Sequence, residues 1–168
     1  MTVASASKSA SAATPAVRVL NLAGIDYSLH SFEHDPATRR YGSEAADELG
    51  VGSDQVFKTL MIQVDGAPVT ALVPVSGQLD LKALASARSA KKAQLAGVAE
   101  TERRTGYPVG GVSPFGQRHA VPVVIDRTVL EHASVFVSAG RRGLEIEIRP
   151  EDLVMLTNAQ VAKIAALD

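Results

Sequence analysis

The chain contains no cysteine and no tryptophan, and aromatic residues make up only 4% of its 168 residues. Without cysteine it can form no disulfide, no cysteine nucleophile and no thiolate metal site. No apolar run approaches the ~20 residues that a membrane-spanning helix needs, so we expect no membrane partner. The lack of cysteine fits a reducing compartment, and we expect a cytoplasmic protein.

The chain also lacks an excess of charge of either sign. It has 17 Lys and Arg against 18 Asp and Glu, which gives a net charge of −1. A nucleic acid would therefore have to bind to a local basic patch rather than through bulk charge. Adjacent basic residues that could build such a patch occur at Arg39-Arg40, Lys91-Lys92, Arg103-Arg104 and Arg141-Arg142. Each pair is equally compatible with an ordinary solvated surface.

Length and composition indicate one folded domain with a short tail. The apolar fraction of 46% and the charged fraction of 21% are usual for a globular chain. Residues 1–13 are mostly Ala, Ser and Thr, and they lack the apolar stretch of at least ~7 residues that a secretory signal needs. We predict a disordered N-terminal tail over residues 1–13 and a single domain over residues 14–168.

Caps and turn residues predict interleaved helices and strands. We expect helices over 14–24, 43–49, 81–88, 98–104, 150–156 and 159–166, and strands over 25–30, 56–64, 69–75, 122–125, 135–137 and 144–148. Thr14 and Asp80 are the expected helix N-caps, and Asp65-Gly66 predicts a hairpin. The alternation favours a mixed α+β or α/β domain over a helical bundle.

A glycine-rich segment covers residues 109–117, where three glycines accompany Ser113 and Pro114. Such a run excludes a regular helix or strand. Glycine permits positive φ and leaves backbone N–H groups open to an anion or a carbonyl, so a binding loop is one interpretation. An ordinary surface loop is the other. The spacing matches neither a Walker nor a Rossmann phosphate loop, and we expect no nucleotide cofactor there.

Lys58 interrupts an apolar strand face. Alternate residues of a strand share a face, so Lys58 should lie beside Leu60 and Ile62. One interpretation is that the ammonium group lies near the strand end and reaches water. The other is that Lys58 projects into a half-buried pocket, where it could hold a phosphate or ester oxygen or transfer a proton.

Five segments together resemble the YbaK family of trans-editing proteins, the stand-alone relatives of the editing domain of bacterial prolyl-tRNA synthetase. The segments are 33–36, 56–60, 77–81, 109–117 and 137–145, and the resemblance extends from Thr14 to about Ala165. Within that family the chain looks most similar to the Cys-tRNA(Pro) deacylases. The resemblance implies a curved, barrel-like mixed sheet flanked by helices, and an enzyme that removes a wrong amino acid from tRNA.

The resemblance also implies the site residues. Lys58 would be the residue most closely tied to activity, and we favour an electrostatic anchor over a general base. Substrate-binding residues would be Phe32, Thr59, Gly110, Gly111, Ser113, Pro114, Gly116, Ser138, Gly140 and Glu145. Arg141 and Arg142 would contact the tRNA acceptor end.

Two of these positions depart from the family pattern. Glu145 stands where aspartate is expected, and alternation with Glu147 also allows a solvated strand face. Phe32 stands where tyrosine is common, and it could stack on a base or pack in the core.

Several chemical alternatives stay open at this point. The thiol of a tRNA-bound cysteine could attack its own ester and give a thiolactone, or a water could hydrolyse the ester. The substrate could be Cys-tRNA(Pro), with Cys-tRNA(Cys) as a further one, or instead Ala- or Ser-tRNA. Prolyl-tRNA synthetase could join a ternary complex. The alternative to an enzyme is a non-catalytic module that binds tRNA or a synthetase.

We expect neither a metal nor another cofactor. His30 and His34 are four residues apart, which in a strand separates them by about 13 Å, too far for one ion.

Overall fold

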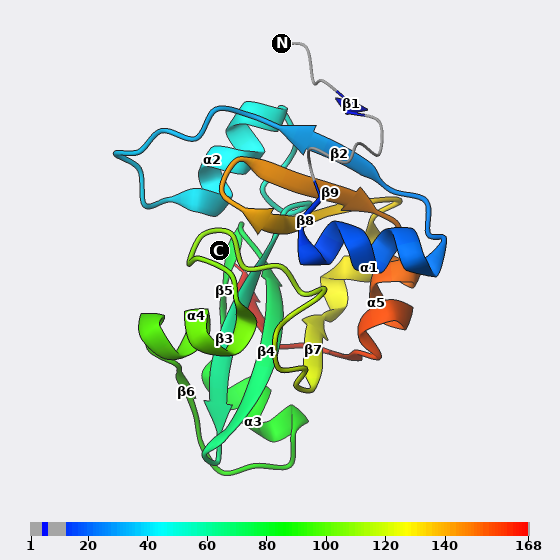
Figure 1. Ribbon diagram of the computed structural model, residues 1–168. Coiled ribbons are helices and arrows are strands. Elements are labelled where there is room, and N and C mark those ends of the chain that lie inside the picture. The colour runs from blue at the N-terminus through cyan, green and yellow to red at the C-terminus, as the bar shows by residue number, and fades with distance from the viewer. Residues whose placement is uncertain (1–4, 7–12, 168) are drawn as a thin grey trace.

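Two larger sheets and one two-stranded ladder make up the β-structure of the computed structural model (Figure 1), which describes residues 5–6 and 13–167. The first sheet is antiparallel and has the order β1 (Ser5–Ala6), β2 (Ser28–Ser31), β9 (Leu144–Ile148) and β8 (Val135–Arg141). The second has the order β10 (Gln160–Ala162), β7 (Val123–Asp126), β4 (Ala67–Pro74), β3 (Phe57–Val64) and β6 (Ala93–Leu95). The ladder joins β11 (Ala165–Leu167) to β5 (Gly77–Leu79).

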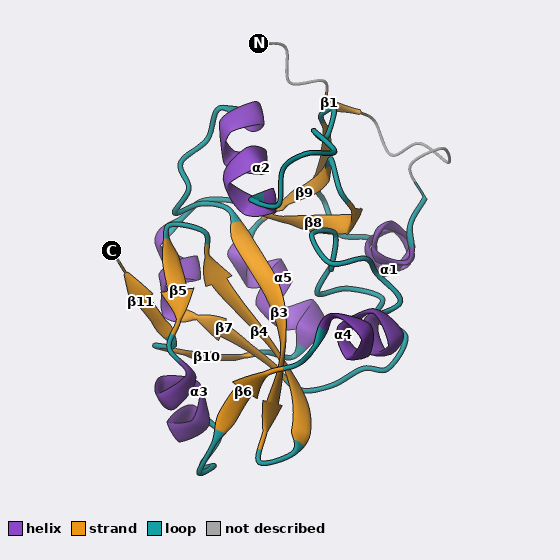
Figure 2. Cartoon of the chain, turned by 90° about the vertical axis from the view of Figure 1, so that its left-hand side faces the viewer, coloured by secondary structure: helices purple, strands orange, loops and turns teal. Residues whose placement is uncertain are grey.

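The second sheet is mixed. Strand β7 is parallel to both of its neighbours, β4 and β10, whereas β3 is antiparallel to β4 and β6. Five α-helices are described: α1 (Pro15–Ala23), α2 (Tyr41–Leu49), α3 (Leu81–Ala87), α4 (Val98–Thr105) and α5 (Pro150–Thr157), with a 3₁₀-helix at Arg127–Glu131. In both views α2 lies beside the first sheet, and α3 lies near the far end of the second sheet (Figures 1 and 2).

Local signals set most element boundaries as predicted. The Thr14 side chain accepts the N–H of Val17 and begins α1, and the Asp80 side chain does the same for Ala83 and α3. The β3–β4 hairpin turns at Asp65 and Gly66, where φ is 49° and 81°. Positive φ at both central residues is the geometry that a two-residue hairpin turn prefers.

A backbone bridge joins the two larger sheets and positions the site. Val56, just before β3, forms a parallel bridge with Phe136 of β8, and the N–H of Phe136 donates to the carbonyl of Gln55 at 3.0 Å. Two residues beyond the bridge, β3 reaches Lys58 and β8 reaches Ser138. The bridge therefore brings two segments about 80 residues apart in sequence to the same place.

One hydrophobic cluster spans both sheets. It joins Leu20 of α1 and Leu153 of α5 to Phe57 and Ile125 of the second sheet and to Ile146 of the first, all at most 2% exposed. Burial of this shared cluster ties the sheets into one mixed α/β domain, which confirms the predicted fold class. The described strands form open sheets, so the implied barrel-like curvature does not extend to a closed barrel.

The predicted helix over 159–166 is wrong. Asn158 does not begin a helix but ends α5 with φ 50°, and the chain continues as β10 and β11. The cause lies elsewhere in the sequence: a buried carboxylate oxygen of Asp126 accepts the N–H groups of Ile164 and Ala165 at 2.9 and 2.8 Å. The apolar spacing of this segment resembles a helix, but its backbone donors bind to β5, β7 and Asp126.

Other differences are smaller. Strand β2 covers 28–31 rather than 25–30, and β5 and β6 were not predicted. The predicted N-terminal tail lies outside the described residues, apart from Ala13 and the two residues of β1, which pair with β2. Within the described part of the chain, no helix has the length and apolar character needed to cross a bilayer.

Candidate active site

A pocket of about 430 Å³ opens where the two larger sheets meet. Val56 and the beginning of β3 supply residues 56–61, and the segment around the start of α2 supplies residues 39–43. The remaining lining comes from the residue after β4, the β6–α4 region, the glycine-rich segment and the β8–β9 pair: Val75, Leu95, Ala96, Val98, Thr101, Val109, Gly110, Val112, Ser138 and Glu145. Five predicted site residues are thus brought together: Lys58, Thr59, Gly110, Ser138 and Glu145.

Lys58 is half-buried and lines this pocket. Its strand continues into the buried Ile62 and Val64, so the backbone of β3 is fixed by the core while Lys58 lies at the open end. Of the two interpretations of Lys58, its position therefore agrees with the one that places it in a half-buried pocket. An ammonium group there can attract a phosphate or steady the negative charge of an ester oxygen.

Ser138 and Glu145 form the sheet side of the pocket. They are directly opposite each other in the β8–β9 register, and they are only 9% and 7% exposed. Burial raises the pKa of the Glu145 carboxyl to about 8. At neutral pH this carboxyl is mostly protonated, so it can donate as well as accept a hydrogen bond.

The strand face of Glu145 and Glu147 is not a solvated one. Glu147 is half-buried and accepts from the Ser134 hydroxyl, and its other oxygen lies 2.9 Å from Nε2 of His30. His30 is directly opposite Glu145 on β2. A layer of polar contacts therefore lies within the first sheet beside the pocket.

Thr59 contributes a hydroxyl that lacks a partner. Its Oγ1 is buried and has no hydrogen-bond partner among the described residues, although Thr59 lines the pocket. A buried hydroxyl without a partner costs roughly 1–3 kcal/mol, so a bound ligand that reaches this atom would recover that free energy.

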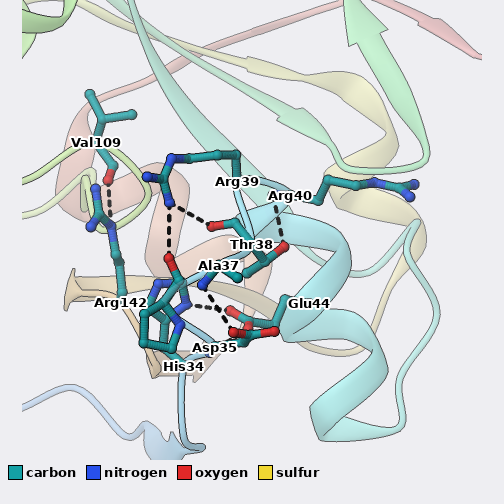
Figure 3. A network of polar contacts seen from close by, with 10 residues as sticks. His34, Asp35, Ala37, Thr38, Arg39, Arg40, Glu44, Val109 and Arg142 are labelled. Atoms are coloured by element: carbon teal, nitrogen blue, oxygen red, sulfur yellow. Dashed lines mark hydrogen bonds and ion pairs between the residues drawn. The ribbon is translucent and has the colours of Figure 1, made fainter.

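Gly110 lines the pocket, and its lack of a side chain leaves room for the ring of Tyr41. A Cβ on Gly110 would lie 2.6 Å from Cγ of Tyr41, and the φ of Gly110 is 89°. The guanidinium carbon of Arg142 lies 4.8 Å from the centroid of the same ring. Nε of Arg142 donates to the carbonyl of Val109 at 2.9 Å, so the glycine-rich segment, the β8–β9 turn and α2 are held together (Figure 3).

Hydrogen bonds also fix the segment that leads into α2 (Figure 3). Glu44 accepts the N–H of Asp35 at 2.9 Å, and its other oxygen lies 2.7 Å from Nδ1 of His34. The Arg39 guanidinium donates to the carbonyls of Pro36 and Thr38 at 3.1 and 3.2 Å. Glu44, in the first turn of α2, is thereby bound to the loop that precedes the helix.

Most of the remaining predicted residues hold the fold around the pocket instead of lining it. Ser113 is fully buried and accepts from the N–H of Phe115, and Pro114 is also buried. A Cβ on Gly116 would lie 2.7 Å from the backbone of Pro15, and one on Gly111 would lie 2.7 Å from Cα of Arg141. The glycine-rich segment therefore uses most of its glycines for close backbone packing.

The last predicted residues lie in two places. Phe32 packs against a cluster that includes Leu49 and Phe136, as in the core interpretation of this residue. Gly140 has φ 109° and packs on the ring of Tyr107, while its N–H donates to the hydroxyl of Ser138 at 3.2 Å. Arg141 at the end of β8 and Arg142 in the turn that follows are both exposed.

Sequence reasoning missed one side of the pocket. The helix was expected from Ser43, but α2 begins at Tyr41, and the Arg39-Arg40 pair that precedes it is part of the pocket lining. The only sequence signal for this side of the pocket was the Arg39-Arg40 pair, and it was one of four adjacent basic pairs in the sequence. No group of three or more His, Cys, Asp or Glu side chains in the described residues is placed to hold a metal ion.

The fold and the pocket define a class of protein, namely a small mixed α/β domain with a pocket whose mostly apolar lining carries a few polar side chains. The family model described as the aminoacyl-tRNA editing domain matches residues 35–156. The chain therefore belongs to the aminoacyl-tRNA editing domain family.

Three relatives place it more closely. The "Putative Cys-tRNA(Pro)/Cys-tRNA(Cys) deacylase EbsC" of Enterococcus faecalis is 34% identical over 152 residues, which cover 90% of this chain and 92% of that protein. A proline–tRNA ligase of Nitratidesulfovibrio vulgaris is 39% identical over 88 residues, covering 52% of this chain and 15% of the ligase. The solved structure of "a putative trans-editing enzyme for prolyl tRNA synthetase" matches with a TM-score of 0.78 and 26% identity, covering 92% of this chain and 98% of that one.

Proposed function

We propose that the chain is an aminoacyl-tRNA deacylase that removes cysteine from mischarged Cys-tRNA(Pro), with Cys-tRNA(Cys) as a further substrate. The observation that carries the proposal is that Lys58, Ser138 and the buried Glu145 line one pocket in a chain of the editing-domain family. The near full-length similarity to EbsC supports cysteine as the amino acid. Residues 14–168 form the editing domain in this proposal.

The pocket suits an amino acid esterified to a terminal ribose. Its volume of about 430 Å³ is within the usual range of roughly 300–1,000 Å³ for sites that bind small ligands. In this proposal Lys58 anchors a phosphate or stabilises charge on the ester oxygen, and Gly110 offers a nearby backbone group. Thr59, Ser138 and Glu145 contact the amino acid. Gly111, Ser113, Pro114, Gly116 and Gly140 shape the walls, and Phe32 supports them from the core.

The nucleophile in the proposed reaction belongs to the substrate. The sulfur of the bound cysteine attacks its own ester carbonyl, a C–S bond forms, and the C–O bond to the ribose breaks. The thiol proton ends on the released ribose oxygen, so the products are a cysteine thiolactone and free tRNA. Placing both groups in one molecule supplies up to roughly 7–11 kcal/mol. The lack of cysteine in the chain is compatible with this route. Hydrolysis by water is the competing mechanism.

The partner in this proposal is the acceptor end of an aminoacyl-tRNA. Arg141 and Arg142 are candidates for contact with it, because both are exposed in a turn that packs on the pocket loop. A ternary complex with prolyl-tRNA synthetase would supply tRNA identity, and it is supported by the similarity to part of a proline–tRNA ligase. The reaction belongs with translation, in the cytoplasm.

The first experiment follows the release of labelled cysteine from preformed Cys-tRNA(Pro) by the wild type and the Lys58→Ala variant. Ala-tRNA(Pro) and Ser-tRNA serve as competing substrates, and mass spectrometry identifies the product. We expect rapid release of cysteine as its thiolactone, and a loss of at least 10²-fold in the variant. Release of alanine or serine alone would change the assigned substrate. Free cysteine as the first product would favour water as the nucleophile. No release from any substrate would contradict an enzyme and leave a binding module.

A further inference from the structure

The mouth of the pocket has two chemically different sides. Arg39 and Arg40 line it from the segment before α2, and both side chains are exposed. Leu95 and Val98 line it from β6 and the start of α4, and each is 61% exposed. In both views α2 lies above the beginning of β3, whereas β6 and α4 lie below it (Figures 1 and 2). A ligand that enters the pocket therefore passes between a cationic side and an apolar side.

The cationic side is held in position. The ring of Tyr41, the residue after the arginine pair, packs on Gly110 and lies against the Arg142 guanidinium. Arg39 donates to carbonyls of its own loop, while the Arg40 side chain extends away from that network (Figure 3). Glu44 is engaged by His34 and by a backbone N–H, so its carboxylate is directed at its own loop. The arginines keep their charge available at the mouth.

This combination fits single-stranded RNA better than a free amino acid. Each nucleotide carries one phosphate charge and one flat, apolar base face. Two arginines on one side and two exposed aliphatic side chains on the other match these two features. The ester to be cleaved is carried by the terminal nucleotide, so the nucleotides before it must cross the mouth of the pocket when the ester is inside.

We propose that the mouth is a groove for the last unpaired nucleotides of the acceptor strand, in which Arg39 and Arg40 contact phosphates and Leu95 and Val98 pack on base faces. The inference rests on the proposed function, because the strand enters together with its ester. It adds the Arg39-Arg40 pair to Arg141 and Arg142 as a place of contact with the acceptor end. It also gives a role to two large apolar side chains that stay exposed beside the pocket.

The test compares two substrates that differ only in the nucleotides that cross the mouth. Cysteinyl-tRNA carries the whole acceptor strand, whereas cysteinyl-adenosine has the same ester without the preceding phosphates and bases. The double variant Arg39→Gln/Arg40→Gln should raise KM for cysteinyl-tRNA roughly tenfold, because phosphate contacts dominate the affinity for nucleic acids. Its kcat, and its kcat/KM for cysteinyl-adenosine, should match the wild type.

Salt dependence gives a second measure. The value of log kcat/KM should fall as log salt rises, and each lost contact to a single-strand phosphate should make that negative slope shallower by about 0.7. Lys91→Gln/Lys92→Gln is the matched control, because it removes an adjacent exposed cation pair that does not line the pocket. This control should keep the KM and the slope of the wild type.

The apolar side is tested with Leu95→Ser/Val98→Ser. This variant should raise KM for cysteinyl-tRNA with no change in salt slope, and it should leave cysteinyl-adenosine unaffected. Leu130→Ser/Met155→Ser is the control, since these side chains are 58% and 61% exposed and do not line the pocket. Unfolding midpoints equal to that of the wild type establish that all four variants are folded.

The outcomes separate this inference from the proposed function. A wild type that cleaves neither substrate contradicts the proposed function itself. A wild type that cleaves both, with an arginine variant that behaves like the lysine control on cysteinyl-tRNA, overturns the groove alone. Equal losses on cysteinyl-tRNA and cysteinyl-adenosine also overturn it, because the arginines would then act on the ester or the pocket shape.

Discussion

Ser138 on β8 lies directly opposite Glu145 on β9, and both line the pocket. In this register β9 places the Glu145 carboxyl in the pocket wall, where the surrounding protein buries it, and this burial raises its pKa to about 8. The family resemblance predicted aspartate at this position. The longer glutamate is nevertheless accommodated, with only 7% of the residue exposed.

Replacing Glu145 with glutamine should change how stability depends on pH. The folded-state pKa of about 8 is above the ordinary value of 4.5, so the folded protein binds more protons than the unfolded chain between these values. The contribution is fully present below pH 4.5 and is lost as the pH rises through about 8, by at most about 1.4 kcal/mol per pH unit. Glutamine does not ionise, so Glu145→Gln should remove this fall. Urea denaturation from pH 5 to 9 measures it, and parallel curves for the two proteins would contradict the prediction.

Thr59→Val should separate stability from function. Valine keeps the shape of threonine but removes the buried Oγ1, which has no hydrogen-bond partner in the described part of the chain. We expect the free energy of unfolding to stay equal or rise by up to about 1 kcal/mol. If substrate binds this hydroxyl, kcat/KM for deacylation falls several-fold, as expected for the loss of one hydrogen bond. Thr59→Ser retains the hydroxyl and is the control. A valine variant with full activity would remove Thr59 from the set of binding residues.

Gly110→Ala should cost both stability and activity. The added Cβ would meet the ring of Tyr41 at 2.6 Å in a backbone with φ 89°. We expect a loss of about 1–3 kcal/mol from backbone strain, a further loss from the displaced ring, and a lower kcat/KM. Gly66→Ala is the matched control, because its φ is 81° and its added Cβ has no neighbour within 4 Å. The control should lose stability only, and equal effects on activity would show that the contact with Tyr41 is irrelevant.

Asp126→Ala should loosen the C-terminal strands. The buried Asp126 carboxylate accepts the N–H groups of Ile164, Ala165 and Thr128. Its removal would leave these three donors without that acceptor. We expect a loss of roughly 3 kcal/mol in the free energy of unfolding and faster hydrogen exchange at Ile164 and Ala165. Asp80→Ala, which removes an exposed N-cap, should cost only about 1 kcal/mol. Similar losses for both variants would contradict a special role for Asp126.

The same carboxyl has a pH dependence of opposite sign. Burial alone would raise the pKa of Asp126, but its hydrogen bonds from Thr128, Ile164 and Ala165 outweigh that effect and lower it. Its contribution is therefore present above the ordinary pKa of 3.8 and is lost as the pH falls through the lowered value. The Asp126→Ala variant should lack this loss in acid denaturation.

Prediction from the sequence succeeded where the determining contacts are local. Thr14, Asp80 and the Asp65-Gly66 pair set their helices and their hairpin through partners within three or four residues, so the sequence alone was sufficient. Lys58 was also singled out locally, because an ammonium group in an apolar strand face is unusual, but that pattern left its position open and its role stays a prediction.

The tertiary structure decided the rest, because the determining partners are distant in the sequence. Asp126 binds the backbone of Ile164 in the C-terminal strand segment from 38 residues away. The Val56–Phe136 bridge joins two segments about 80 residues apart and so brings Lys58 and Glu145 to one pocket. The burial of Glu145 depends on strands that pair with β9 from both sides. Helical and strand periodicity report which side chains are apolar, whereas pairing and water exclusion depend on packing between segments that no local pattern specifies.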